Sequence, residues 1–166
     1  MEHARAHGYP VPRVDEIGED TLVLERIDGP TMQEALERRP WTLPRHMNAL
    51  ASLHDRLHEI EHPEGGTLLH LDLHPLNVIY GADGPVVIDW TNASAGDAAL
   101  DPALTAVIFL TSGGIPGRVA TPLFLRHFER AEIDRAMPAA VEYRIADPNV
   151  LPHERDRLER LRRRYR

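Results

Sequence analysis

The sequence predicts an α+β fold in which a small β part is followed by a mostly helical remainder. Two observations favour this class. Strand-like alternation is confined to a few short runs in the first 90 residues, and helical spacing of apolar residues dominates elsewhere. The composition agrees, because 166 residues with 42% hydrophobic and 27% charged side chains are enough for one domain with a core.

The N-terminal segment is predicted to contain a short helix followed by a β-hairpin. A helix over residues 2–7 is ended by Gly8 and the YPVP segment. Strands are expected over 13–17 and 21–27, joined by a GED turn, and the DGP tripeptide ends the second strand.

A capping box marks the next helix. Thr31 precedes a helical pattern over residues 32–39, and Glu34 stands three residues after it, the spacing at which the two side chains cap each other's backbone N–H groups. Thr31 is therefore predicted to be the N-cap.

The clearest helical pattern covers residues 43–60. Apolar residues recur there at three- and four-residue spacing and define one buried face: Met47, Leu50, Leu53, Leu57 and Ile60. Three histidines share the helix, and we predict that His46, His54 and His58 flank this face at the surface, with a ligand role as the alternative.

The C-terminal half is predicted to be helical. Residues 100–111 are almost all apolar, which indicates a buried helix, and a second helix is expected over 119–131 after a glycine-rich break. Residues 137–152 give no clear assignment. The arginine-rich tail favours a solvated amphipathic helix with an apolar stripe of Leu151, Leu158 and Leu161.

Composition excludes several kinds of chemistry. All 19 basic residues are arginine, so a Schiff-base lysine, a Walker-type lysine and a kinase strand lysine are all impossible. The chain has no cysteine, which excludes disulfides and thiolate catalysis. A net charge of −7 argues against a nucleic-acid binder, and the apolar runs are too short to span a membrane. A cytoplasmic protein is the simplest expectation.

The stretch HLDLHPLNVIYGADGPVVIDW, residues 70–90, concentrates the chemistry-bearing side chains. Its β-rich triplets VIY and VVI flank a GADGP turn signal and predict a hairpin. Folding the hairpin brings Asn77 near Asp89, because paired strand positions lie roughly 5 Å apart. An amide oxygen beside a carboxylate oxygen suits Mg²⁺, which prefers hard oxygen ligands.

Asp72 lies five residues before Asn77, on the loop that enters this hairpin. A free carboxylate beside a metal-bound phosphate can orient and deprotonate an attacking hydroxyl group. The order H-x-D-x-x-x-x-N followed by an aspartate at the end of the next strand is typical of kinase catalytic loops.

Two other interpretations of this stretch stay open at this point. A polar turn without chemistry could contain any one of these residues. In addition, His70, Asp72 and His74 alternate as H-x-D-x-H, which also suits a Zn²⁺ or Mn²⁺ hydrolase.

The motifs HLDLHPLN and VIDW resemble the aminoglycoside phosphotransferase family of kinase-like small-molecule phosphotransferases, to which choline and homoserine kinases are similar. The motif usual in that family is nearer to HGDLHPGN, so Leu71 and Leu76 stand where glycines are usual. The GDAALD, YPVPRV and LVLERIDG segments continue the resemblance.

The resemblance implies site residues and co-substrates. ATP and Mg²⁺ would be used to phosphorylate a hydroxyl group of a small molecule. Asp101 would cap the helix that follows it. The other implied roles are a catalytic base, Asp72; metal ligands, Asn77 and Asp89; adenine contacts from the backbone around Glu25 and Ile27; and structural support of the loop, His70 and Asp97.

The resemblance also implies an architecture. A protein-kinase-like C-terminal lobe, mostly helical and carrying a catalytic-loop β-hairpin, would cover residues 31–166, and residues 1–30 would be a short N-terminal β-hairpin remnant of the N-lobe and hinge. Since the sequence lacks the strand lysine and a Gly-rich loop before Val14, a non-catalytic pseudokinase acting as a binding module is the alternative. Self-association, or pairing with an N-lobe partner, is expected through residues 13–27.

Overall fold

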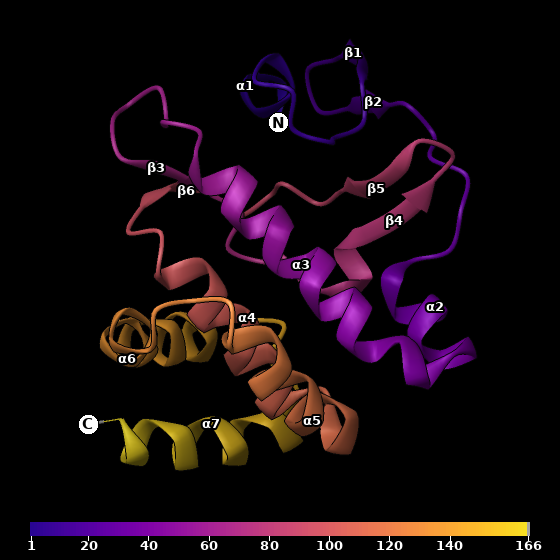
Figure 1. Ribbon diagram of the computed structural model, residues 1–166. Helices are drawn as coiled ribbons and strands as arrows, with labels where there is room; N and C mark the ends of the chain where they lie inside the picture. The colour runs from indigo at the N-terminus through magenta and orange to yellow at the C-terminus, as the bar shows by residue number, and fades with distance from the viewer. Residues whose placement is uncertain (166) are drawn as a thin grey trace.

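The computed structural model describes residues 1–165, which form helices and three separate two-stranded antiparallel sheets. In Figure 1 the small β elements lie at the top and centre, and helices α4 to α7 gather below them. The elements in chain order are α1 (Glu2–Ala6), β1 (Val14–Ile17), β2 (Leu22–Leu24), α2 (Met32–Arg38), the 3-10 turn η1 (Pro40–Thr42), α3 (Leu43–His58), β3 (Thr67–Leu69), η2 (Pro75–Asn77), β4 (Val78–Gly81), β5 (Gly84–Val87), β6 (Ser94–Gly96), α4 (Leu100–Thr111), α5 (Gly114–Leu125), α6 (Arg130–Ala146) and α7 (Pro152–Arg164). The α+β prediction is confirmed.

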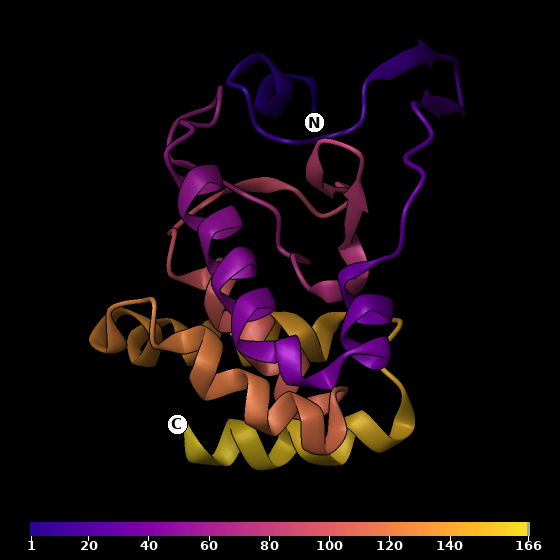
Figure 2. The same ribbon diagram turned by 45° about the vertical axis from the view of Figure 1, so that its right-hand side comes forward.

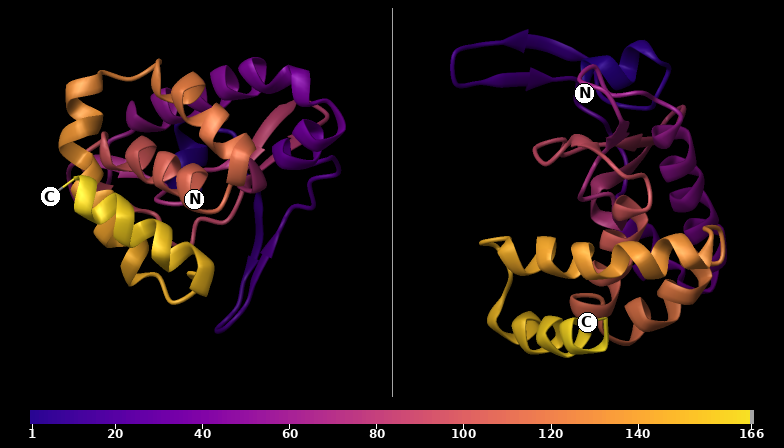
Figure 3. Two further views of the ribbon diagram at one scale, coloured as in Figure 1. Left: turned by 90° about the horizontal axis from the view of Figure 1, so that it is seen from below. Right: turned by 90° about the vertical axis from the view of Figure 1, so that its left-hand side faces the viewer.

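Two of the three sheets are the predicted hairpins. Strands β1 and β2 pair with Val14 opposite Leu24, and this hairpin extends away from the rest of the chain as an arm (Figure 3). Strands β4 and β5 pair around a tight turn in which Gly81 lies opposite Gly84. The third sheet, β3 with β6, was not predicted, because its strands are three residues long and 24 residues separate them.

Helix α2 begins with the predicted capping box. The Glu34 backbone N–H donates to Thr31 Oγ1 at 3.1 Å, and the Thr31 N–H donates to the Glu34 carboxylate at 2.9 Å. The backbone N–H groups of Thr31 and Glu34 at the start of α2 therefore both find acceptors within three residues. For this reason the sequence was sufficient to locate the start of the helix.

Helix α3 runs through the middle of the molecule (Figure 2) and buries more than one face. His54 is fully buried and His46 is 9% exposed, so the prediction that they flank the apolar face at the surface is wrong. The rings of Phe124 and Phe128 pack against His54 with centroids 5.3 and 6.0 Å away. Helix α5, which carries Phe124, and the turn after it, which carries Phe128, supply this second contact surface, which the periodicity of α3 alone did not reveal.

Helix α4 is buried along almost its whole length, as predicted. The next two helices differ from the prediction: α5 starts at Gly114 and ends at Leu125, while α6 continues to Ala146 through Pro138. The glycines here permit close packing, because a Cβ on Gly117 would collide with the Phe109 carbonyl. Pro138 is tolerated inside α6 because neighbouring residues of the helix are buried against α4.

Helix α7 confirms the amphipathic tail, with one correction. Leu158 is buried and Leu161 is partly buried, but Leu151 precedes the helix as its N-cap and is 53% exposed. Arg162 pairs with Glu142 of α6 at 2.6 Å, which ties the basic tail to the helical layer. Within the part of the chain that the structure describes, no helix is long and apolar enough to cross a membrane.

The core consists of two clusters of buried side chains, and the loop between β3 and β4 lies between them. Leu68 and Leu73 belong to the cluster around α3, whereas Leu69 and Leu71 belong to the cluster around α4 and α6. Anchoring on both sides holds this loop in one path, and the residues predicted to carry the chemistry lie on it.

Candidate active site

The β4–β5 hairpin brings Asn77 and Asp89 to the same end of two strands. Val78 pairs with Val87, and the Ile88 backbone N–H donates to the Asn77 carbonyl at 3.0 Å, one residue before Asp89. The register that the GADGP turn predicts is confirmed. His74 accepts from the Leu76 N–H at 3.3 Å and starts the 3-10 turn that delivers Asn77 to the strand.

Asn77 connects the hairpin to Asp72. Its amide nitrogen donates to the Asp72 backbone carbonyl at 2.9 Å and to the Asp72 carboxylate at 3.1 Å. The nitrogen is thereby committed to Asp72, and the other end of the amide offers an oxygen. Since Asp89 is exposed and offers carboxylate oxygens at the same end of the hairpin, this donor set fits a hard cation such as Mg²⁺.

Asp72 is a partly buried carboxylate that stays ionised. Burial acts to raise the pKa of Asp72, but His74, whose Nε2 lies 3.3 Å from the carboxylate, together with His70 and Asn77, holds that pKa below its ordinary value. Asp72 is therefore an unprotonated acceptor at neutral pH, as a group that takes a proton from a hydroxyl must be.

His70 is fully buried below the loop and is held by backbone groups on both ring nitrogens. Its Nε2 donates to the Ile88 carbonyl at 3.0 Å, and its Nδ1 accepts from the Asp72 N–H at 3.2 Å. Burial lowers the pKa of His70, so the ring is neutral. Because both nitrogens bond backbone groups, the geometry does not favour His70 as a metal ligand beside Asp72 and His74, which the H-x-D-x-H hydrolase interpretation requires.

Asp101 carries a contact that the sequence analysis missed. Its carboxylate accepts from the backbone N–H groups of His70 at 2.9 Å and Leu71 at 2.8 Å. It was expected to cap α4, but it lies inside the first turn, fully buried. An aspartate within an otherwise apolar helix was the available signal, because such a charge is buried only when it is paired.

Asp97, expected to support the loop, lies elsewhere. Its carboxylate accepts from the Ala99 N–H at 3.1 Å at the start of α4, and it pairs with Arg135 at 3.0 Å on the surface. The sequence analysis thus exchanged the two aspartates: Asp97 serves the helix start and Asp101 holds the loop. Both roles were implied by the family resemblance alone, which does not show which of the two carboxylates turns inward.

Two residues of the site have left-handed backbones. Leu71 has φ of 60° and Asp89 has φ of 61°. Aspartate tolerates this conformation, whereas leucine pays about 1–2 kcal/mol for it. The glycine usual in the family at the position of Leu71 avoids this strain, and here the buried side chain of Leu71 compensates by packing against the α4–α6 core.

A cavity of about 680 Å³ opens beside Asp72, His74 and Asp89. Its opposite wall comes from the end of α6 and the segment after it, where it is lined by Tyr143, Arg144, Asp147 and Asn149. Arg144 pairs with Asp147 at 2.5 Å, so this wall is braced internally. A pocket of this size with polar groups on both walls suits a small polar molecule.

The predicted nucleotide-contacting residues lie outside this cavity. Glu25 follows β2, where its N–H donates to the Arg13 carbonyl at 2.8 Å. Ile27 reaches the β4–β5 turn, with its side chain against Gly81. The structure therefore brings Asp72, Asn77 and Asp89 together, and it leaves Glu25 and Ile27 on the strand connection beside the hairpin.

The fold is that of the kinase-like phosphotransferases. Among solved structures, a thermostable mutant of aminoglycoside phosphotransferase APH(4)-Ia is similar, with a TM-score of 0.69 and 16% sequence identity over 98% of this chain and 81% of that one. The model of the phosphotransferase enzyme family (APH) matches residues 33–142, more than half of the sequence. The chain belongs to this family. A search of curated proteins finds no match.

Proposed function

We propose that this chain transfers a phosphoryl group from ATP to a hydroxyl group of a small molecule. The observation that carries the proposal is the meeting of Asp72, Asn77 and Asp89 at one end of the β4–β5 hairpin, beside a polar cavity. Asp72 would accept the hydroxyl proton, and Asn77 with Asp89 would hold Mg²⁺. When bound, Mg²⁺ supplies positive charge to the phosphate oxygens.

The acceptor would enter the cavity between the loop and α6. Asp72 and Asp89 put negative charge on one wall, while Tyr143 and Asn149 add hydrogen-bonding groups on the other. This arrangement favours a polar acceptor with several hydroxyl or amino groups. An ATP-dependent activity would place the protein in the cytoplasm.

The nucleotide would be bound by the backbone around Glu25 and Ile27. This assignment, and the division into an N-lobe and hinge part over 1–30 and a helical lobe over 31–166, rests on the family resemblance. These 166 residues contain no lysine, so within them an arginine or a backbone group would have to meet the phosphates.

A second candidate function is that of a non-catalytic binding module. The observation favouring it is the β1–β2 arm, where four large apolar side chains are exposed: Ile17 by 67%, Leu22 by 53%, Val23 by 47% and Leu24 by 37%. Exposed apolar strands tend to acquire a partner. We propose self-association through residues 13–27.

Light scattering after size-exclusion chromatography tests self-association through the β1–β2 arm. The wild type should be larger than a monomer, and Ile17→Glu should shift it toward the monomer. The control Ile115→Glu changes a similarly exposed apolar residue on α5 and should leave the size of the protein unchanged. A wild-type protein that stays monomeric at high concentration would contradict the proposed self-association.

Calorimetric titration of ATP with and without Mg²⁺ tests the phosphotransferase proposal. We expect binding that requires Mg²⁺ and is lost in Asp89→Asn, a substitution that keeps tolerance of the left-handed backbone. Asp72→Asn should keep nucleotide binding and abolish transfer to any acceptor found in a screen of hydroxylated compounds. ATP binding that ignores both Mg²⁺ and Asp89 would contradict the assignment.

A further inference from the structure

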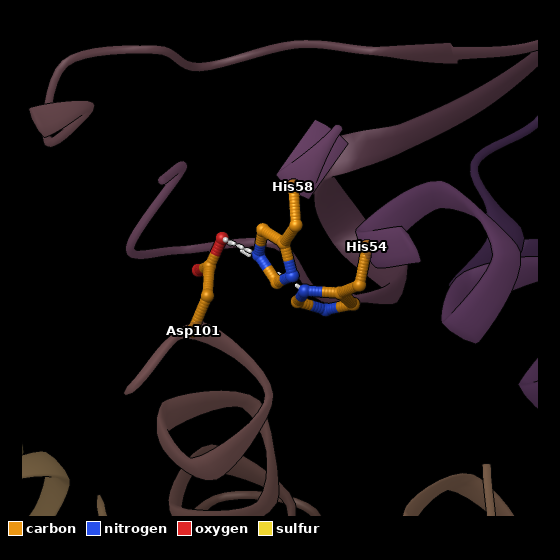
Figure 4. A group of neighbouring side chains, drawn as sticks. All are labelled: His54, His58 and Asp101. Carbon is orange, nitrogen blue, oxygen red and sulfur yellow. Dashed lines mark hydrogen bonds and ion pairs between the residues drawn. The ribbon is translucent and has the colours of Figure 1, made fainter. Parts of the chain in front are cut away.

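A second cluster of ligand-type side chains lies behind the loop, apart from Asn77 and Asp89. His54 and His58 extend from consecutive turns of α3 toward Asp101 at the start of α4 (Figure 4). One ligand atom from each residue lies within 4.8 Å of the other two. His58 Nε2 is 3.3 Å and His54 Nδ1 is 3.8 Å from Asp101 Oδ2.

The hydrogen bonds of Thr105 determine which nitrogen of His54 carries its proton. Thr105 Oγ1 donates its own hydrogen to the Leu73 carbonyl at 2.7 Å. The same oxygen lies 3.2 Å from His54 Nε2 and can therefore only accept there. His54 is thus protonated on Nε2, and its Nδ1 presents a lone pair.

That lone pair is buried and has no hydrogen-bond partner. His54 Nδ1 is one of two buried side-chain atoms left unsatisfied among residues 1–165, and the His54 side chain is 0% exposed. It faces a carboxylate oxygen, another acceptor. Two acceptors that face each other are unfavourable unless a hydrogen-bond donor or a cation lies between them.

We propose that His54, His58 and Asp101 bind a zinc ion. Two histidines four residues apart on one helix are a common zinc-binding arrangement. Zinc bonds of about 2.0–2.1 Å place tetrahedral ligand atoms roughly 3.3 Å apart. The His58–Asp101 separation matches this value, whereas His54 Nδ1, 3.8 Å from Asp101 and within 4.8 Å of the His58 nitrogen, would have to move closer to both on binding. The fourth ligand would be water, reached past His58, which is 12% exposed.

The ligand chemistry separates this site from the proposed magnesium site. Two imidazole nitrogens favour zinc over magnesium, which prefers oxygen ligands. A zinc ion here would join α3 to α4 and, through Asp101, to the backbone of the loop at His70 and Leu71.

The test uses the purified chain stripped of metal with a chelator and then titrated with Zn²⁺, with Co²⁺ as a spectroscopic substitute. We expect one saturable Zn²⁺ per chain and the intense visible absorption of tetrahedral Co²⁺. His58→Gln should lower Zn²⁺ affinity by more than about 100-fold, beyond the loss that outer-shell changes cause. Excess Mg²⁺ should not compete.

His7→Gln is the matched control. His3 on α1 and His7, the C-cap residue of α1, are also four residues apart, but their rings bond backbone carbonyls and are close to the surface. The control should keep full Zn²⁺ affinity, and circular dichroism should show both variants folded. Absence of saturable Zn²⁺ binding by the wild type would overturn the proposal. Binding lost in His7→Gln but kept in His58→Gln would overturn it as well. Neither result depends on phosphotransfer.

Discussion

The Asp101 carboxylate accepts a 2.8 Å hydrogen bond from the backbone N–H of Leu71, a residue 30 positions earlier in the chain. The same carboxylate accepts from the His70 N–H and lies against His58. One buried side chain therefore holds the loop backbone immediately before Asp72. The position of Asp72, the proposed catalytic base on the loop, therefore depends on Asp101, which belongs to helix α4.

Replacing Asp101 by asparagine should destabilise the fold. The asparagine side chain has one acceptor oxygen, so its NH₂ group would face one of the two backbone N–H donors. An unsatisfied buried donor costs about 1–3 kcal/mol. Urea unfolding at neutral pH measures this loss. Asp97→Asn is the control, and it should cost less than about 1 kcal/mol because its ion pair with Arg135 is exposed. Equal losses in the two variants would contradict the loop-holding role of Asp101.

Acidification should destabilise the protein through its buried histidines from about pH 6.5 downward and, in addition, through Asp101 below about pH 4. Burial lowers the pKa values of His54 and His70, so below about pH 6.5 the unfolded chain takes up protons that the folded chain does not. Each histidine then contributes up to about 1.4 kcal/mol of lost stability per pH unit. The pKa of Asp101 is held well below its ordinary value, against burial, by His58 and other partners. Its contribution is therefore lost only below about pH 4.

Urea midpoints between pH 4 and 8, measured with a chelator present, test this pH dependence. His54→Gln should flatten the decline below pH 6.5, while His153→Gln on the exposed start of α7 should leave it unchanged. A wild type equally stable across pH 5–7 would show that the buried histidines do not govern acid stability.

At position 71 the usual order of stability, in which an alanine variant exceeds a glycine variant, should be reversed. Leu71→Ala removes a buried side chain, at a cost of about 2–5 kcal/mol, and keeps the left-handed strain. Leu71→Gly loses the same packing but relieves about 1–2 kcal/mol of strain. The glycine variant should therefore be at least as stable as the alanine variant in urea. An alanine variant more stable than the glycine variant by about 0.5 kcal/mol or more, which is the ordinary order, would refute this prediction.

Removing the cap of α2 should affect stability alone. Thr31→Ala should cost about 1 kcal/mol, because the Glu34 N–H loses its acceptor. Thr31→Ser should recover most of the loss. ATP titration provides the second measurement, since the two hydrogen bonds of the capping box join Thr31 and Glu34 to each other and involve no proposed site residue. A changed nucleotide affinity in Thr31→Ala would connect α2 to the site.

The parts that the sequence predicted well depend on neighbours in the chain. The Thr31 capping box joins residues three apart, and the register of β4 and β5 follows from the tight turn between them. The encounter of Asn77 with Asp72 and Asp89 is a direct consequence, because a short loop and one hairpin connect them. For this reason the proposed catalytic residues could be identified before the fold was known.

The failures involve contacts between distant segments. His54 was assigned to the surface because the periodicity of α3 indicates one apolar face, and nothing local shows that α5 covers another. The β3–β6 pair was not predicted because its partners are far apart in the chain. Asp97 and Asp101 were exchanged because a family resemblance in sequence does not show which carboxylate turns inward.

Local sequence was therefore sufficient for the α+β class, the capping box, the hairpin and the three oxygen-bearing residues at its end, since each depends on backbone chemistry within a few residues. Only the tertiary structure decided that Asp101 holds the loop, that His54 faces it with an unpartnered nitrogen, and that α6 closes the cavity beside Asp72. The physical reason is that burial and charge pairing depend on which segments pack together, and side-chain spacing in one segment does not contain that information.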